Sequence, residues 1–161
     1  PKVLVQFAWR LTNIQLNSII PPTMISESGS EYIPQGIAVI EHGKGTGVRE
    51  IQKDQNFGKE VGGTREVEFT LDPNKAIQWH VHPKMNETFT AVDGELSILI
   101  ITGANKNGPE IQTRHLFLGQ SLLVEKDTPH LVFNKSEGSI TATATQQIVE
   151  VGGNTVNFDL I

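Results

Sequence analysis

The sequence predicts an all-β fold. Apolar and polar residues alternate with a period of two over much of the chain, and turn residues interrupt this alternation at short intervals. Such alternation is typical of strands, because neighbouring side chains of a strand face opposite sides of its sheet. After Gly36, no segment shows the stripe with a period of about 3.6 residues that an amphipathic helix needs. The length of 161 residues suits one domain with a single hydrophobic core.

The composition narrows the class of protein. Hydrophobic residues make up 37% of the chain and charged residues 19%, as in a globular protein rather than a disordered or membrane-spanning one. The net charge of −5 comes without a cluster of Lys and Arg, which argues against nucleic acid or a membrane surface as a partner. The absence of Cys excludes disulfides and thiolate ligands. Since no signal-peptide pattern is visible either, we expect a cytoplasmic protein.

The first 35 residues differ from the rest, and we expect residues 1–35 to form an N-terminal arm. They contain an apolar start at residues 3–7, the breaker Pro21-Pro22 and a stretch rich in Ser and Gly at residues 26–30. Two interpretations stay open: a strand or short helix followed by a loop, or a strand added at the edge of a sheet. Residues 36–161 are expected to form the β-domain.

The predicted strands follow in order. Residues 64–71 alternate clearly, and residues 76–82 form the next strand. Residues 87–92 come after them and are closed by Asp93-Gly94, the strongest short hairpin signal in the chain. The largely apolar run at residues 97–102 predicts a buried strand, because both of its faces must be covered. The polar segment 103–109 predicts a loop, and the remaining predicted strands are 111–118, 121–124, 130–134, 139–147 and 155–160.

Three histidines and one carboxylate are the candidate metal ligands. His80 and His82 are two residues apart, so on a strand both rings point to one side. Glu87 opens the next predicted strand, and His130 must come from a distant strand, as a closed barrel permits. Three imidazoles and one carboxylate suit a catalytic first-row metal and leave coordination positions open. Taken alone, the His-x-His spacing is a weak signal, and it favours ordinary residues of a solvated sheet face over metal ligands.

The residues around these four form two motifs. His80-x-His82-x-x-x-x-Glu87, followed by Gly94, resembles the first signature of the cupin superfamily. A second set resembles the second signature: Gly119, Glu125, Asp127, His130 and Asn134. The resemblance covers about residues 64–144, and the two motifs occur in the right order.

The resemblance implies a double-stranded β-helix, the jelly-roll barrel of cupins, over residues 36–161. It also implies that His80, His82, Glu87 and His130 hold one divalent transition metal. The second signature usually has Pro and Gly where this chain has Glu125 and Asp127. The turn before His130 must therefore be made by other turn residues.

Alternation along the strands predicts the wall of a substrate pocket. Gln78 should share the face of the first two histidines, and the other predicted wall residues are Phe89, Ala91, Val132 and Asn134. This wall is largely apolar, with Gln78 and one of Thr141, Thr143 or Thr145 as polar exceptions, and it suits a compact, partly hydrophobic molecule. No Arg or Lys is expected to face inward, although a register shift of one residue would bring in Arg65 or Arg114. Trp79, His42 and His115 are expected outside the site.

Three functions stay open. The favoured one is a metal-dependent enzyme of small-molecule metabolism, a dioxygenase using Fe(II), in which Glu87 could also act as the catalytic base. Mn, Ni, Co or Zn would fit the same ligands. The second is a redox-neutral isomerase, cyclase or decarboxylase, whose metal polarises a carbonyl group. The third is a cupin that binds a small ligand without turnover. The family resemblance also implies a homodimer, with the apolar residues 3–7 as a candidate for strand exchange.

Overall fold

The computed structural model describes residues 32–40 and 47–151, and in this part the chain is built from β-strands without an α-helix. Residues 1–31 of the expected arm lie outside the described residues, as do His42 and the strand predicted at residues 155–160. None of the described residues belongs to a helix long and apolar enough to cross a membrane. The strands are β1 (Ala38–Ile40), β2 (Arg49–Lys53), β3 (Thr64–Leu71), β4 (Lys75–His80), β5 (Met85–Asp93), β6 (Leu96–Asn105), β7 (Gly108–Leu116), β8 (Ser121–Val124), β9 (His130–Asn134) and β10 (Ile140–Ile148).

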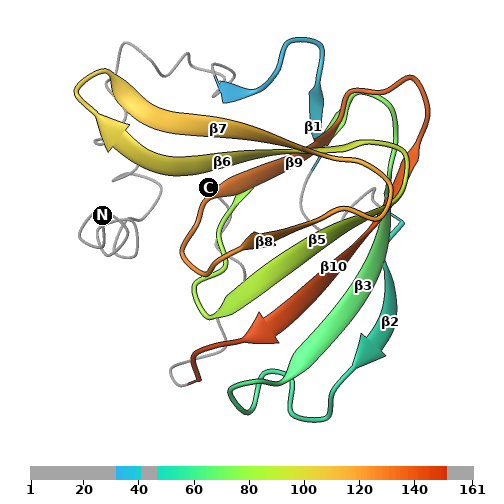
Figure 1. Cartoon of the computed structure of the whole chain (residues 1–161), viewed down its shortest axis with the longest axis vertical. Coiled ribbons are helices and arrows are strands. Elements are labelled where there is room, and N and C mark those ends of the chain that lie inside the picture. Colours follow the sequence, from blue (N-terminus) through green and yellow to red (C-terminus); the bar gives the residue numbers. More distant parts are fainter. Residues whose placement is uncertain (1–31, 41–46, 152–161) are drawn as a thin grey trace.

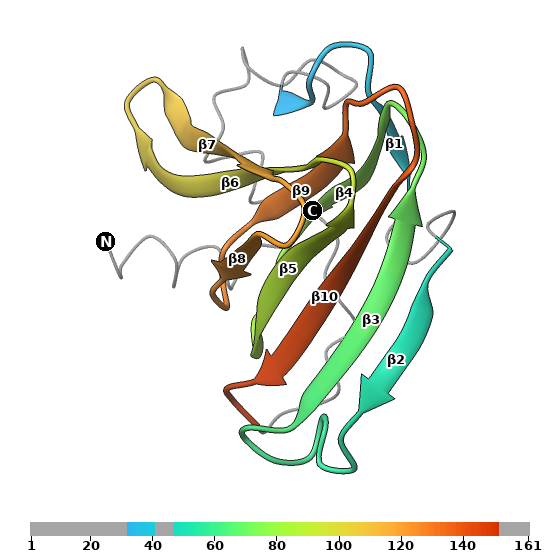
Figure 2. The ribbon, with the colours of Figure 1, turned by 45° about the vertical axis from the view of Figure 1, so that its right-hand side comes forward.

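The strands form two five-stranded sheets (Figure 1). Their orders are β1-β4-β9-β6-β7 in the first sheet and β2-β3-β10-β5-β8 in the second. From β3 to β10 every connection except the β6–β7 hairpin crosses from one sheet to the other, so strands from distant parts of the sequence become neighbours. Figure 2 shows the sheets as two separate layers of strands. This arrangement is a double-stranded β-helix, and the predicted fold class is confirmed.

The main hydrophobic core lies between the two sheets. The second sheet contributes Phe69, Phe89 and Ala144, and the first contributes Ile98 and Val132; each is at most 3% exposed. These side chains occupy every second position of their strands, as alternation predicts. The core therefore joins the inner faces of both sheets.

A second apolar cluster covers the outer face of the first sheet. It contains Ala76, Leu99, Leu131 and Phe133, and the half-buried Trp79 packs against it, away from the inner face, as predicted. Both faces of β6 and β9 are thus covered over part of their length. This explains why these strands are apolar without alternation.

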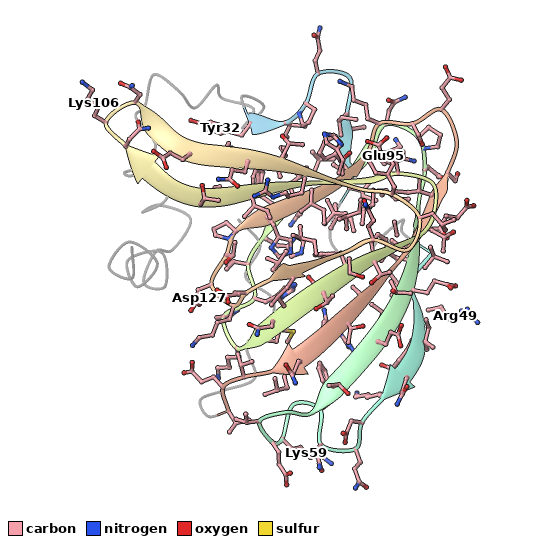
Figure 3. The ribbon with its side chains drawn as sticks, viewed as in Figure 1. Tyr32, Arg49, Lys59, Glu95, Lys106 and Asp127 are labelled. Carbon is pink, nitrogen blue, oxygen red and sulfur yellow. The ribbon has the colours of Figure 1, made fainter. Side chains whose placement is uncertain are left out.

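The prediction of a loop at residues 103–109 is wrong. β6 continues to Asn105 and β7 begins at Gly108, so Lys106 and Asn107 alone connect them. The hairpin projects from the barrel, with Lys106 at its tip (Figures 1 and 3). The outer residues of the two strands pair through backbone hydrogen bonds and face solvent, so the hairpin needs no apolar side chains there. The polar composition therefore resembles that of a loop.

β1 and β2 have no counterpart among the predicted strands. All five residues of β2 are exposed, and this strand forms the edge of the second sheet. A strand with no buried face carries no alternation of apolar and polar residues. β2 is a strand because it pairs with β3, and this pairing cannot be inferred from the local composition.

Candidate metal centre

The four candidate ligands come from both sheets and meet at one place. His80 ends β4 and His130 begins β9, where the two residues lie opposite each other in the first sheet. Glu87 comes from β5 of the second sheet, and His82 follows β4 in the connection to β5. The possible ligand atoms of all four residues lie within 4.8 Å of one another. The predicted convergence of these side chains is therefore present in the structure.

The cluster is almost completely removed from solvent. His80 and His130 are 1% exposed, His82 2% and Glu87 3%. The carboxylate oxygen Oε2 of Glu87 lies 2.9 Å from Nε2 of His82 and 3.3 Å from Nε2 of His130. Burial of this many polar groups is unfavourable unless each is compensated by a partner or an ion.

Main-chain carbonyl groups fix two of the imidazole rings. Nδ1 of His80 donates to the carbonyl oxygen of Gln78 at 2.8 Å, and Nδ1 of His130 donates to that of Thr128 at 2.9 Å. Because a carbonyl oxygen only accepts, the proton must be on Nδ1 in both rings. A neutral ring held in this way keeps its Nε2 lone pair for a metal.

The local backbone explains how His80 and His82 both become buried. The register between β4 and β9 shifts between Ile77 and His80, so regular alternation is interrupted just before the first ligand. β4 ends at His80 rather than at residue 82, and the predicted strand 76–82 is too long by two residues at this end. A bulge of this kind redirects side chains and is common next to functional sites.

The turn before His130 is made with Asp127. Its φ of 62° lies in the left-handed region, which Asp tolerates better than most residues because it is short and polar. Its backbone N–H donates to the carbonyl oxygen of His82 at 2.9 Å and so connects the two segments that carry ligands. Figure 3 shows Asp127 on the loop between β8 and β9. Asp127 thus makes the turn at the position where the second signature usually has Gly.

The electrostatics of Glu87 favour an ionised carboxylate. Burial by itself would raise the pKa of Glu87, but the neighbouring His82 and the hydrogen bonds from His130 and His82 together hold that pKa well below its usual range. This lowered pKa favours the charged form of the carboxylate in spite of its burial.

The donor set fits a metal ion. Nδ1 of His130 already donates to a carbonyl group, so its Nε2 can donate to the Glu87 carboxylate only if it carries a second proton, and a metal cation between the two atoms would take the place of that proton. Two ligand atoms that are each about 2.1 Å from one ion and at right angles lie about 3 Å apart. The observed separations of 2.9 and 3.3 Å agree with this value.

The predicted wall residues differ in their surroundings. Phe89, Ala91 and Val132 are buried in the main core, and the Phe89 ring meets the His130 ring edge-on with centroids 5.6 Å apart. The side chain of Gln78 is half-buried, and its carbonyl group holds the first histidine. Contact of these residues with a substrate stays a prediction.

Asn134 has the contacts of a structural residue. Its Nδ2 donates to the carbonyl oxygens of Leu71 and Gly138, and its Oδ1 accepts from the N–H and hydroxyl groups of Ser136. Its hydrogen-bonding groups are therefore used to hold the turn after β9. It lies at the opposite end of β9 from His130.

The expectation that a threonine of β10 faces the site is wrong. Ala142 and Ala144 belong to the main core, so the three threonines that alternate with them, Thr141, Thr143 and Thr145, face the other side of the sheet. The inward polar residue of β10 is Gln146, 2% exposed, whose Nε2 donates to Oε1 of Glu87 at 2.8 Å. The alternation of two alanines with Gln146 could have indicated this face.

The expectation that no basic residue faces inward is wrong for Arg65. This residue shares the inner face of β3 with Val67 and Phe69, and its guanidinium group bonds to Gln146. Arg114 is exposed and bonds to Gln112. His115 is outside the site, as predicted: it is exposed and contacts Ser97 and Glu95.

Solved structures with the same arrangement support the fold, whereas no family model and no curated protein matches the chain. The Cupin_2 domain of an XRE family transcriptional regulator from Enterobacter cloacae is 16% identical, with a TM-score of 0.51 over 65% of this chain and 98% of that one. An uncharacterised protein with a double-stranded β-helix domain from Klebsiella pneumoniae is 17% identical, with a TM-score of 0.51 over 76% of this chain and 89% of that one.

Oxalate oxidase in complex with glycolate is 19% identical, with a TM-score of 0.53 over 67% of this chain. The matched region spans 53% of oxalate oxidase, about half of its length. At these identities the likeness concerns the fold, and the four converging side chains add a possible site for one metal ion. The protein thus has a double-stranded β-helix fold, which it shares with these solved structures, a Cupin_2 domain among them.

Proposed function

We propose that the protein holds one divalent transition metal through His80, His82, Glu87 and His130 and acts as an enzyme on a small, partly apolar organic molecule. The observation that carries this proposal is the convergence of four buried side chains whose possible ligand atoms lie within 4.8 Å of one another, with Nε2 of His130 3.3 Å from Oε2 of Glu87. A cation between the ligand atoms would compensate the burial of these polar groups.

The ligand set supports catalysis rather than a purely structural role. A structural metal site usually fills every coordination position with protein side chains, whereas four ligands leave positions open on an ion that prefers six. When bound, the metal would supply Lewis-acid or redox chemistry at those positions. Fe(II) is the favoured ion, and Mn, Ni, Co or Zn would accept the same nitrogen and oxygen donors.

The surrounding residues would orient the ligands and exclude water. The carbonyl groups of Gln78 and Thr128 hold two of the rings, and Phe89 packs against His130. The lowered pKa keeps Glu87 charged, which favours a ligand over a general base, since a base works best with a pKa near the working pH. The role of Glu87 as a catalytic base is thus the less supported of its two predicted roles.

The reaction that we favour is the oxidation of the substrate by dioxygen. Among the solved structures with this fold, oxalate oxidase is an enzyme, which is compatible with oxidative chemistry on the same scaffold. A redox-neutral isomerisation, cyclisation or decarboxylation is the alternative within the enzymes. A binding module is the alternative of another class, because the similar Cupin_2 domain belongs to a transcriptional regulator.

Elemental analysis and oxygen uptake test this proposal. The purified protein should contain about one transition metal per chain, and the Fe(II)-loaded protein should consume oxygen in the presence of a panel of small organic acids, diketones and phenols. Turnover of the same compounds under strict anaerobiosis would replace the oxygenase by the redox-neutral alternative. A protein that takes up no divalent metal at all would contradict the proposed site.

Three further expectations belong to the proposal: a cytoplasmic location, a homodimeric assembly, and a small molecule as the partner rather than nucleic acid or a membrane. The location rests on the absence of Cys, and the lack of a nucleic-acid partner rests on the net charge of −5. Light scattering of the purified protein measures the oligomeric state, and a monomeric mass would contradict the dimer.

A further inference from the structure

Three polar side chains form a row across the inner face of the second sheet. Arg65 of β3 lies opposite Gln146 of β10, and Gln146 lies opposite Glu87 of β5. Nε and Nη2 of Arg65 donate to Oε1 of Gln146 at 3.0 and 2.6 Å, and Nε2 of Gln146 donates to Oε1 of Glu87 at 2.8 Å. A chain of hydrogen bonds thus runs from a half-buried guanidinium group to the buried carboxylate.

The chemistry of the neighbours determines the orientation of the Gln146 amide. Arginine only donates hydrogen bonds and an ionised carboxylate only accepts them, so the amide oxygen must face Arg65 and the amide nitrogen must face Glu87. The reverse orientation would make both contacts repulsive. The guanidinium group therefore prevents the amide from turning over. It also lies over the Phe57 ring, 4.9 Å from its centroid, which restricts its own movement.

The orientation has a consequence for the two oxygens of Glu87. Oε1 accepts the hydrogen bond from Gln146, whereas Oε2 faces His82 and His130. The row thus distinguishes two oxygens that are chemically equivalent in an isolated carboxylate. Oε2 would thus be the oxygen that holds a bound ion, while Oε1 stays on Gln146.

We infer that Gln146 is a positioning residue for the metal ligand Glu87, and that Arg65 acts through Gln146 by fixing the amide. The inference rests on the proposed metal site and assigns Glu87 as a ligand through the single oxygen Oε2. Partners that orient a ligand in this way commonly change metal affinity about 10- to 100-fold when they are removed.

The first experiment compares Gln146→Leu with the matched control Gln147→Leu. Gln147 is the neighbouring residue of β10, but its side chain is exposed. Competition with a chelator measures the dissociation constant of Co(II) for each protein. Gln146→Leu should bind the ion about 10- to 100-fold more weakly than the wild type, and Gln147→Leu should bind it with unchanged affinity.

The visible absorption of bound Co(II) separates positioning from a purely structural role, because this spectrum depends on the number of ligand atoms. Gln146→Leu frees Oε1, so its spectrum should shift towards that of a higher coordination number at saturating Co(II). Thermal unfolding of the metal-free variants gives the stability in parallel. A loss of stability with unchanged affinity and an unchanged spectrum would make Gln146 structural and overturn the inference.

A double-mutant cycle tests the role of Arg65. Arg65→Met should weaken Co(II) binding less than Gln146→Leu does, since the amide stays present but can turn over. The double variant should bind no more weakly than Gln146→Leu alone, because Arg65 acts through Gln146. If the losses of Co(II) affinity in the two single variants add up in the double variant, Arg65 does not act through Gln146. If Gln146→Leu fails to fold, the affinity and spectrum of Arg65→Met decide in the same way.

The inference and the proposed function fail in different ways. A wild-type protein that binds neither Co(II) nor another divalent ion would contradict the metal site, and with it both proposals. Binding by the wild type with equal affinity in Gln146→Leu and Gln147→Leu would contradict the positioning role alone.

Discussion

In two histidines of the cluster, the ring nitrogen Nδ1 is bonded to a main-chain carbonyl group, and this contact fixes the orientation of the ring. His80 and His130 each bond to the carbonyl group of the residue two positions earlier, Gln78 and Thr128. This local arrangement fixes the ring without any contribution from a distant part of the chain. His115, whose ring is exposed and contacts Glu95, shows the contrasting case of a histidine at the surface.

Replacement of one ligand should remove metal binding, whereas replacement of a surface histidine should not. His130→Ala deletes a buried Nε2 that faces Glu87, so we expect the metal content to fall from about one ion per chain to almost none. His115→Ala should keep the wild-type content. Elemental analysis after dialysis measures both, and equal metal content in the two variants would contradict the assignment of ligands.

Asp127 should tolerate only residues that accept a left-handed backbone. Asp127→Asn should leave stability nearly unchanged, because Asn adopts a φ near the observed 62° as readily as Asp. Asp127→Val should lower the free energy of unfolding by about 1–3 kcal/mol, since a β-branched side chain is strained there. Urea denaturation of the metal-free proteins measures the difference. Equal midpoints would show that the backbone adapts without cost.

The sequence predicts the four ligands but not the residues that orient them. His80, His82 and Glu87 lie within eight residues, so local spacing carries most of the pattern. Gln146 is 59 residues from Glu87 and reaches it through the pairing of β10 with β5. Nothing in the sequence around Gln146 indicates that its strand pairs with β5, so only the structure shows that this side chain contacts Glu87.

At the scale of elements, strand ends are the least predictable feature. β8 and β9 have the predicted bounds, because apolar runs and turn residues delimit them on both sides. β6 ends later and β7 begins earlier than predicted, since the outer part of this hairpin is polar and is held by cross-strand hydrogen bonds, whereas β7 also ends two residues before the predicted residue 118. Local composition indicates which residues are buried, whereas the length of a strand in a hairpin depends on how far the neighbouring strand pairs with it.

The turn between β5 and β6 should depend on Gly94. Its φ is +80°, and a Cβ added there would lie 2.5 Å from Cγ2 of Ile140. Gly94→Ala should therefore lower the free energy of unfolding by about 2–4 kcal/mol through backbone strain and overpacking. Gly138→Ala is the control, because that glycine has open space around it. Chemical denaturation measures both, and equal effects would show that the contact with Ile140 is relieved by a small shift.

At the scale of the whole molecule, the candidate metal site connects the two sheets. Three ligands belong to β4, β9 and the segment after β4, and the fourth belongs to β5 in the opposite sheet. The all-β class follows from alternation in the sequence. The double-stranded β-helix follows only from the two motifs, because alternation does not say which strands are neighbours.

Metal binding should therefore stabilise the entire fold. For an ion that binds only the native state, a free concentration of 100 times its dissociation constant adds about 2.7 kcal/mol to the free energy of unfolding. The melting temperature should rise with added metal and return to its starting value with a chelator. His130→Ala should show no such rise, and a rise equal to that of the wild type would place the ion elsewhere.

The burial of the ligands also has a kinetic consequence. With each of the four side chains at most 3% exposed, an ion can enter or leave only when part of the surrounding wall moves. Exchange would then be limited by protein fluctuations rather than by diffusion of the ion. The ion captured while the chain folds would then be replaced slowly, so a chelator or a competing ion would need a long incubation to reach equilibrium. The metal found in a purified sample would accordingly record the supply in the cell that made the protein.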